Sequence, residues 1–593
     1  MRLLIVFFIG LIASFYLGEV IKRTFKRPLP TPIGLLIILS GFIIGFQGFR
    51  FIPQPLDIFT SLFLIGSGLG FTFHHLLSQS YLISEKHEHG FFRRHPRLFD
   101  RLIEILPGSL TWIGLTSPFW LSLTMPFAVA YFVLIAQIYW MISAVRMAIL
   151  IIIGYRKMEY AKKQPWLTLL KKDFPDEWED YYHVFLLPTY KDSLEVLGPA
   201  FDAITNQNYP KEKIILAVGF EERSNPKEFH AETIKYLKEE ISKKVGQVIL
   251  SFHPADLPGE ISGPGTNRNW MVKTITDELE KKKIPVEKVI ATTLDCDFVV
   301  HHELLAGMLH KYLSLPVEQR MHRSFTGAFL YYNNYWQAPT PMRLLATGTA
   351  FWQIAEMVGS DKYQNFSSLS INFKSLLEIG GWIPDKVNDD SGFYWKAYFH
   401  YKGDYKVLPH FIPITADAVL DVNLIKTIKN QYLQLKRWAY GVEHLPFIFR
   451  QYFKNRDIDF WDKTDKLLFV LWANLRWGFL AFFVTFAGLL IPYLNPQYND
   501  SVVAINLPIV SSWILTAAFI GLFATIYVHE RTVPPRPKSW SVIRRLWSYM
   551  QTLLVPLVLV TISTLPAIDA QTSLLFGKYL GFRTTNKARK EIE

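Results

Sequence analysis

Apolar residues are concentrated at the two ends of the chain, in roughly the first 155 and the last 130 of its 593 residues, whereas the middle is mixed and charged. A helix needs about 20 apolar residues to cross a hydrocarbon core about 30 Å thick. The pattern therefore predicts two groups of membrane helices around a globular middle domain. The expected spans are 3–20, 32–50, 57–78, 109–124 and 127–154 before that domain, and 466–492, 504–528 and 550–568 after it. Segment 109–124 is short and polar enough to be re-entrant, and Pro556 and Pro566 interrupt the last span.

The middle segment, about 160–455, alternates short apolar runs with helical patterns. Such alternation predicts a largely parallel sheet with helices on both faces. The strand-like runs are 182–187, 213–218, 247–252, 288–294 and 325–331, and the helical patterns are about 191–207, 228–243 and 268–282. Ligands of such sheets bind outside the carboxyl ends of the strands, so functional residues are expected there.

The formal net charge of +12 comes with basic clusters beside the apolar spans, such as Arg93 and Arg94 before the fourth span and Arg544 and Arg545 near the C-terminus. Short cytoplasmic loops carry such an excess, which predicts an outside N-terminus and a cytosolic middle domain. The sequence has no RNA-binding motif, so the expected partner is a lipid bilayer and not nucleic acid. The single cysteine, Cys296, excludes an intramolecular disulfide and suits a reducing compartment. The early apolar run lacks an A-x-A-like cleavage site and is expected to remain as a membrane anchor.

The run ATTLDCDFVV places Asp295 and Asp297 one residue apart at the end of a strand-like segment. Two carboxylates there can hold a hard divalent cation, Mg²⁺ or Mn²⁺, with nucleotide phosphates completing its oxygen shell. For an isolated D-x-D, however, a polar turn after a strand is the more common explanation.

About 90 residues later, Asp389 and Asp390 open a helical pattern in VNDDSGFYWKAYF. Adjacent like charges raise the pKa of one carboxyl group, and the pair offers a candidate general base. Helix N-capping alone explains such a pair equally well.

The segment NQYLQLKRWAYG contains Gln434, Arg437 and Trp438 as Q-x-x-R-W. Gln434 and Trp438 share one helix face, and Arg437 lies one step round. Trp can stack on a sugar ring and Arg can bind a phosphate bidentately. A single copy is also typical of an interfacial helix whose Arg and Trp lie at lipid headgroups.

Together and in this order, the three motifs resemble those of the processive family 2 glycosyltransferases, such as cellulose, chitin and hyaluronan synthases. The resemblance covers roughly 180–440 and the flanking helix arrangement. It implies an α/β catalytic domain of the GT-A fold and inverting transfer from a UDP-sugar to a growing polysaccharide, with possible translocation. The implied organisation is transmembrane helices (1–155), a cytosolic GT-A domain (160–422), interfacial helices (423–462), transmembrane helices (463–580) and a tail (581–593) of a multi-pass plasma or inner membrane protein.

The resemblance also implies roles, residue by residue. Asp390 is the implied catalytic base, and Asp295 and Asp297 are the implied metal ligands. The implied nucleotide contacts are Thr189, Tyr190, Glu221, Glu222, Asn267 and Asp295. The implied acceptor and diphosphate contacts are Asp389, Gln434, Arg437 and Trp438. The tail sequence FRTTNK, with Phe582, Thr585 and Lys587, looks like a gating loop that closes over the nucleotide.

Two departures from the family pattern concern the nucleotide. The family has an Asp pair after its second strand, where this chain has Glu221 and Glu222. Where many members have a Lys before an Asn, this chain has Pro264 with Asn267 retained. A phosphate-facing cation is therefore missing unless Arg268 or the tail supplies one. Three C-terminal crossings would put the tail outside, so segment 550–580 is expected to form a hairpin or to lie at the interface.

Two other functions fit the same residues. One is non-processive transfer of a single sugar to a lipid acceptor, as in ceramide glucosyltransferases with similar motifs. The other is a catalytically dead transport or scaffold protein, which the Glu replacements and the missing Lys favour. Asn474 and Arg476, flanked by Trp472 and Trp477, suit the path of a glycan through the membrane, but snorkelling at a helix end explains them equally well.

Overall fold

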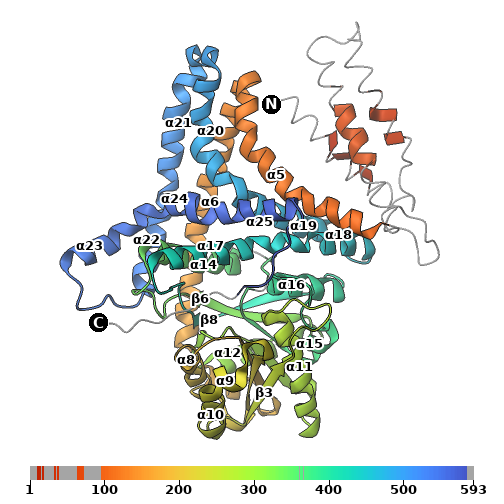
Figure 1. The fold of residues 1–593 in the computed structure, drawn as a ribbon, viewed down its shortest axis with the longest axis vertical. Coiled ribbons are helices and arrows are strands. Elements are labelled where there is room, and N and C mark those ends of the chain that lie inside the picture. Colours follow the sequence, from red (N-terminus) through yellow and green to blue (C-terminus); the bar gives the residue numbers. More distant parts are fainter. Residues whose placement is uncertain are drawn as a thin grey trace.

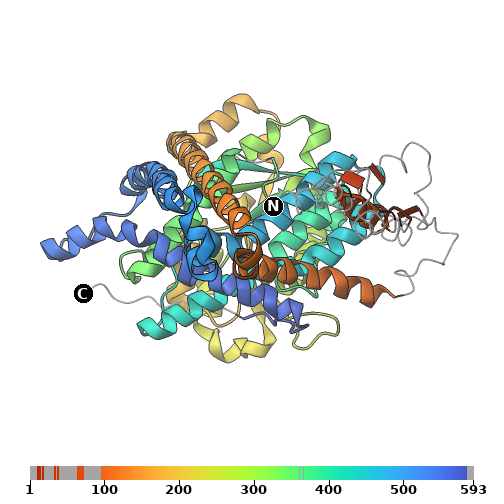
Figure 2. The same ribbon diagram turned by 90° about the horizontal axis from the view of Figure 1, so that it is seen from above.

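The computed structural model describes residues 95–359, 361–364 and 366–583, and parts of the segment 10–72. Its helices and strands form three tiers (Figure 1). Apolar helices rise at one end, a sheet domain lies at the other, and a tier of helices runs across between them. Seen from above in Figure 2, helices of the transverse tier run lengthwise across the view. The rising helices include α5 (Pro96–Thr124), α6 (Pro126–Lys163), α20 (Ala481–Leu494) and α21 (Val502–Ala518), and the transverse tier includes α17 (Leu424–Ala439), α23 (Val542–Met550) and α25 (Leu565–Leu575).

The sheet has eight strands in the order β3-β2-β1-β4-β7-β6-β8-β5. Strands β1 to β4 are mutually parallel, and β6 is parallel to β8, but β7 and β5 run antiparallel to their neighbours. The prediction of a largely parallel sheet was therefore right for one half only, because short antiparallel strands complete the other. The strands are β1 Tyr182–Thr189, β2 Ile214–Glu221, β3 Gln247–His253, β4 Val289–Thr293, β5 Val299–Val300, β6 Arg323–Leu330, β7 Leu369–Asn372 and β8 Lys406–Thr415.

Helices cover both faces of the sheet, and the three predicted helical patterns correspond to α8, to α9 and α10, and to α11. Trp166–Asp173 forms α7 where the chain enters the domain. The remaining helices of the domain are α8 Leu194–Thr205, α9 Pro226–Phe229, α10 Ala231–Glu239, α11 Pro264–Lys281, α12 Leu304–Leu313, α13 Val317–Arg320, α14 Thr340–Gly359, α15 Phe373–Ile379 and α16 Asp389–His400. Beyond the domain follow η6 Tyr440–His444, α18 Leu445–Lys454, α19 Phe460–Leu475, η7 Arg476–Leu480, α22 Ile520–Thr532, α24 Val555–Val558 and η10 Leu559–Thr564.

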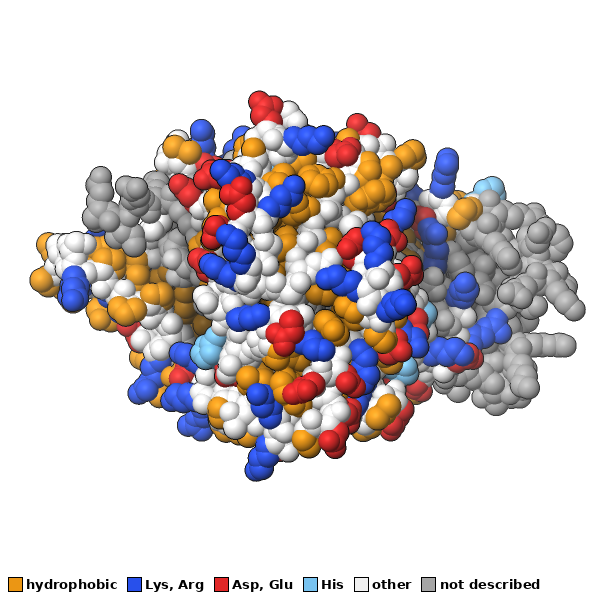
Figure 3. Space-filling view, turned by 90° about the horizontal axis from the view of Figure 1, so that it is seen from below, with side chains coloured by type: hydrophobic (Ala, Val, Ile, Leu, Met, Phe, Trp, Pro, Cys, Tyr) orange, Lys and Arg blue, Asp and Glu red, His pale blue; other side chains and the backbone are white. Residues whose placement is uncertain are grey.

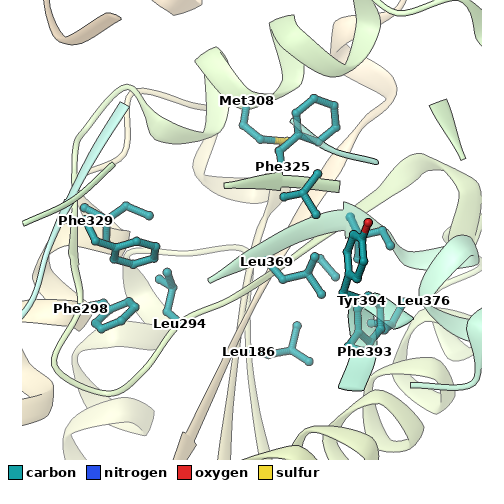
Figure 4. Close-up of a cluster of buried hydrophobic side chains, with 14 of the residues drawn as sticks. Leu186, Leu294, Phe298, Met308, Phe325, Phe329, Leu369, Leu376, Phe393 and Tyr394 are labelled. Atoms are coloured by element: carbon teal, nitrogen blue, oxygen red, sulfur yellow. The ribbon is translucent and has the colours of Figure 1, made fainter. Parts of the chain in front are cut away.

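The core of the sheet domain is built from the buried faces of both halves of the sheet. Figure 4 shows Leu186 of β1, Leu369 of β7, Phe325 of β6 and Phe393 of α16 among its members. Each of these four side chains is at most 2% exposed. Because β1 and β2 are buried along almost their whole length, their sequences are continuous apolar runs and not alternating ones. The surface at the sheet-domain end of the molecule, seen from below in Figure 3, carries interspersed Lys, Arg, Asp and Glu side chains.

Within the described residues, three helices are long and apolar enough to cross a membrane: Pro126–Lys163, Phe460–Leu494 and Val502–Thr532. They contain the predicted spans 127–154, 466–492 and 504–528. The expected span 109–124 is instead the second half of α5, which is interrupted by Pro107 and Pro118 and is not among the three. The predicted spans 3–20, 32–50 and 57–78 lie largely outside the described residues.

The expected last span, 550–568, lies in a bent segment. Val542–Leu554 and Leu559–Leu575 meet at 56°. Helix α25 lies against α17, where Lys436 Nζ and Tyr432 Oη are 2.8 and 3.0 Å from the Asp569 carboxylate. After α25 the chain descends toward the sheet domain (Figure 1). The described start of the tail therefore lies on the side of the sheet domain.

Candidate active site

Polar residues end the four parallel strands at one edge of the sheet. Thr189 ends β1, Glu221 ends β2 and His253 ends β3, and Asp295 lies two residues beyond the end of β4. Carboxyl ends of parallel strands share an edge, which is where α/β sheets bind ligands.

Arg268 joins the two acidic motifs at this edge. Its Nη1 lies 2.7 Å from Asp389 Oδ2, and its Nη2 lies 3.1 Å from Asp295 Oδ1. A third carboxylate, Asp390, has its Oδ1 3.9 Å from Nη1. Arg268 comes from the start of the second turn of α11, and Pro264 at the first helical position fixes the start of the helix.

The Arg268 side chain is almost completely buried, with 1% of the residue exposed. Burial would lower the pKa of its guanidinium, but the carboxylates of Asp389, Asp390 and Asp295 outweigh that effect and raise it. The cation is thus permanent, and it partly neutralises a cluster of three carboxylates. Arg268, one of the two candidates for the cation missing at Pro264, thus contacts carboxylates at this edge.

The Asp390 carboxyl group has a strongly altered proton affinity. Burial, and next the charge of Asp389, raise its pKa to about 7, against the opposing effect of Arg268. Its Oδ2 accepts a hydrogen bond of 2.8 Å from the Ser367 backbone N–H. A quarter of its side chain, 24%, stays accessible to solvent. A carboxylate with this pKa can accept a proton near neutral pH.

The turn that carries the paired aspartates is held by η6. Glu443 Oε1 accepts hydrogen bonds of 2.8 Å from the backbone N–H groups of Val387 and Asn388. Asn388 Nδ2 in turn donates to the Trp438 carbonyl over 3.1 Å. Because Asn388 immediately precedes α16, this bond fixes the Q-x-x-R-W helix and the acidic pair relative to each other. The two motifs, far apart in the chain, therefore form one unit.

The two aspartates of the D-x-D face different surroundings. The Asp295 side chain is 36% exposed at the sheet edge. Asp297 is buried, and its Oδ2 accepts a hydrogen bond of 2.9 Å from the Asp417 backbone N–H. The residues described contain no group of three or more His, Cys, Asp and Glu that could hold a metal ion. Any divalent cation here would take several ligands from phosphate and water, which is how Mg²⁺ usually binds with nucleotides. The donor set fits that mode.

The proposed nucleotide end contains a chain of paired charges. Glu221 Oε2 lies 3.2 Å from His253 Nδ1 and 3.3 Å from Arg223 Nε, and His253 Nε2 lies 3.0 Å from Glu260 Oε2. Burial would lower the pKa of His253, but Glu221 and Glu260 outweigh it and raise that pKa. Glu222 is exposed beside them. Of the predicted Glu pair, Glu221 is thus held in place and Glu222 is not.

The remaining predicted nucleotide residues lie beside this chain. The Arg223 guanidinium lies over the Tyr190 ring, with its Cζ 4.2 Å from the ring centroid. Thr189 Oγ1 donates a hydrogen bond to Asp192 over 3.1 Å. Asn267 Nδ2 donates to the Gly219 carbonyl over 3.0 Å, and a side chain at Gly219 would collide with it.

Arg437 meets the start of the tail near the same carboxylates. Its guanidinium lies 4.5 Å from the ring centroid of Phe582, and Phe582 also packs on Gly263 at the start of α11. Arg437 Nε is buried without a hydrogen-bond partner among the described residues. Burial lowers the pKa of Arg437, whereas the nearby Asp389, Asp295 and Asp390 oppose that effect. A cation so placed suits a phosphate group. Thr585 and Lys587 lie outside the described residues.

Gln434 and Trp438 are half-buried on α17. Trp438 packs edge-on against Phe366 at 5.6 Å, and Phe366 immediately precedes Ser367, which binds Asp390. Sequence reasoning missed Phe366, Ser367 and His253 because none belongs to a spaced motif. The only signal was the position of His253 at the end of a predicted strand.

The sequence matches no protein-family profile, and no curated protein matches it. Similar solved structures include mannosyltransferase PcManGT from Pyrobaculum calidifontis in complex with GDP-Man and Mn²⁺, with 14% identity and a TM-score of 0.34 over 75% of this chain and 100% of that chain. S. aureus TarS 1-349 in complex with UDP-GlcNAc is similar with 14% identity and a TM-score of 0.30, over 70% of this chain and 99% of that chain. At these scores and identities the likeness carries no conclusion about this chain, whose activity must be inferred from its own residues.

Proposed function

We propose that this chain is a membrane-embedded inverting glycosyltransferase with a GT-A catalytic domain, which transfers a sugar from a UDP-sugar to an acceptor hydroxyl on the cytosolic side. The observation that carries the proposal is the meeting of Asp295, Asp389 and Asp390 around Arg268 at the carboxyl edge of the sheet. Acidic motifs about 90 residues apart in the chain have no structural need to meet around a buried cation. A site that binds a diphosphate and also places a proton acceptor beside it would give the two motifs a reason to meet.

In the proposed site the donor lies along the sheet edge. Its base would lie beside Thr189, Tyr190, Glu221, Glu222 and Asn267. Its diphosphate would lie between Asp295 and the guanidinium of Arg437. Three carboxylates face two guanidinium groups there, so the added negative charge of a diphosphate favours binding together with a divalent cation. Asp295, and Asp297 if it turns outward, would hold Mg²⁺ or Mn²⁺, which would supply charge neutralisation to the departing diphosphate.

Asp390 would act as the general base. The proton of the acceptor hydroxyl passes to a carboxylate oxygen of Asp390, and the hydroxyl oxygen forms a bond to the anomeric carbon of the sugar. The bond from that carbon to the diphosphate oxygen breaks on the opposite face, so UDP departs and the configuration inverts. A base within hydrogen-bond reach contributes about 10²–10⁴-fold to such a step.

The proposal is tested by screening UDP-sugars for hydrolysis and transfer by the full chain in detergent. Asp390→Asn keeps the size of the side chain but removes the base, so transfer should fall by about 10²–10⁴-fold while UDP binding persists. Asp277→Asn, on the exposed side of α11, is the matched control. Full turnover by the Asp390 variant would refute the base assignment. Absence of both UDP binding and hydrolysis in the wild-type chain would favour the transport or scaffold alternative.

Whether the product is a polysaccharide or a single-sugar lipid is decided by product length. Membrane helices on both sides of the domain and the gating-loop-like tail favour elongation with translocation. Gel separation of the product made from a labelled UDP-sugar distinguishes a polymer from a glycolipid.

A further inference from the structure

Two arginines occupy the same depth in the apolar helices. Asn495 Nδ2 donates to the carbonyls of Ser122 and Leu123, so the outer end of α20 lies level with the turn from α5 into α6. Arg146 lies about 20 residues along α6 from that level, and Arg476 lies about 18 residues before the end of α20. At 1.5 Å per residue, both are about 30 Å from the outer ends. That distance is the thickness of a hydrocarbon core, so both reach the depth of the inner headgroups.

Both arginines lie near the same acidic side chain, Glu356 of α14, and their charges act on its carboxyl group. Among the described residues, neither arginine has a carboxylate oxygen within 4.0 Å. Arg146 Nη2 donates to the Gly359 carbonyl over 3.2 Å, and Arg476 Nη1 lies 3.4 Å from Tyr139 Oη. Two cations beside one anion leave a positive charge at headgroup depth, where an anionic group is the natural complement.

The surface beside Arg146 is apolar and exposed. On α6 the exposed neighbours are Ile138, Ile142, Val145 and Ile149. Trp472, whose Nε1 donates to Tyr139 Oη over 2.9 Å, is 40% exposed on the adjoining helix. A hydrocarbon chain can lie on this surface while an anionic headgroup contacts the arginines.

Aromatic rings lead from these arginines to the proposed base. Trp352 lies one turn before Glu356 on α14 and is 40% exposed. Its ring centroid is 5.9 Å from that of Phe366, which is 5.6 Å from that of Trp438. Ser367, the residue after Phe366, binds the Asp390 carboxylate. Aromatic rings of this kind suit the faces of sugar rings.

From this arrangement we infer that the acceptor is a membrane lipid whose sugar is attached through phosphate, with Arg146 and Arg476 binding the phosphate. The inference rests on the proposed function and names the acceptor class for the same site. The lipid chain would lie on the apolar side of α6, and its sugar would reach along Trp352 and Phe366 toward Asp390. A phosphate bound by both arginines would explain why two cations lie at this depth with no direct ion pair to the nearby Glu356 carboxylate.

The test uses the full chain in nanodiscs of neutral phosphatidylcholine, with a polyprenyl phosphate and the matching uncharged polyprenol as probes. Binding is measured by native mass spectrometry. The wild-type chain should bind the phosphate at least 10-fold more tightly than the alcohol. The double variant Arg146→Gln, Arg476→Gln should lose most of that preference, and Arg146→Lys, Arg476→Lys should keep part of it. Arg531→Gln, at the end of another apolar helix, is the matched control.

Three results would overturn the inference: equal binding of the polyprenol, unchanged preference in the double Gln variant, or equal competition by phosphatidylglycerol, which would indicate general attraction to anionic lipid. Hydrolysis of a UDP-sugar by the wild-type chain without acceptor is measured in parallel. Hydrolysis without selective lipid binding would reject the acceptor class alone. Selective lipid binding without hydrolysis of any UDP-sugar would reject the proposed transferase function and leave a lipid-phosphate site.

Discussion

Arg268 Nη1 lies 2.7 Å from Asp389 Oδ2, and this contact joins residues 121 positions apart in the chain. The same guanidinium also contacts Asp295, so the two acidic motifs have a common cation. An arginine can do this because its fork of donors serves two carboxylates at once, whereas the ammonium of a lysine is a point charge. Arg268, which lies outside the three predicted motifs, thus organises this site.

Removal of the Arg268 charge should move the pH dependence of transfer. Arg268 lowers the pKa of Asp390, which burial and Asp389 have raised to about 7. A base must be ionised to work, so wild-type kcat should rise with pH through about 7. Without the guanidinium, as in Arg268→Met, the rise should shift to higher pH by about 1–3 pH units. Arg268→Lys keeps the charge and should shift the profile less. Thermal unfolding of each variant identifies loss of fold, and an unmoved profile in a folded Met variant would contradict this coupling.

His253 should control donor affinity. It lies between Glu221 and Glu260, and these carboxylates raise its pKa above the ordinary value. The protonated ring therefore holds Glu221 at low and neutral pH, and this contribution is lost as pH rises through the raised pKa. His253→Gln should raise the KM for the UDP-sugar several-fold, with a smaller change in kcat, and should flatten the alkaline rise of KM. His400→Gln, exposed at the end of α16, is the control. Equal losses in KM and kcat at every pH would indicate a merely structural role.

Glu443 should matter for stability and catalysis together. Its carboxylate accepts the backbone N–H groups of Val387 and Asn388, immediately before the paired aspartates. Glu443→Ala leaves the buried Val387 N–H and the part-buried Asn388 N–H without this acceptor. An unsatisfied buried donor costs about 1–3 kcal/mol. The free energy of unfolding should fall accordingly, and kcat should fall because the Asp389–Asp390 turn loosens. Glu443→Gln retains an acceptor oxygen and should recover most of the stability in denaturant titrations. A stable but inactive Gln variant would mean that the charge of Glu443 takes part in the reaction.

The sequence predicted that the acidic motifs meet, but it did not predict how the residues within each motif are arranged. Asp295 lies at this edge because carboxyl ends of parallel strands share it, and that rule applies to sequence alone. Asp389 instead reaches the edge from the start of α16, which no strand rule predicts. Asp297 was expected to act beside Asp295, as residues two apart on a strand would. Strand β4, however, ends at Thr293, so the alternation of faces no longer holds and Asp297 turns inward to the Asp417 backbone. Strand β7 was missed because four residues, LSIN, carry no period that distinguishes them from a loop. Ser367 contributes its backbone N–H to Asp390, and a backbone contact cannot be predicted from the residue type.

Phe582 connects the tail to the proposed diphosphate cation, and its removal should weaken donor binding. The ring lies 4.5 Å from the Arg437 guanidinium and also covers Gly263 at the start of α11. Cation–π contacts of this kind contribute about 0.5–2 kcal/mol, which corresponds to about 2–30-fold in affinity. Phe582→Ala should therefore raise the KM for the UDP-sugar within that range, and Phe582→Tyr should retain most of the affinity because it keeps the ring. Phe576→Ala, at the exposed end of α25, is the control for loss of apolar surface. If Phe582→Ala bound donor as tightly as wild type while the tail still returned to the site, the aromatic contact would have no part in holding the nucleotide, and the likeness of FRTTNK to a gating loop would lose its support.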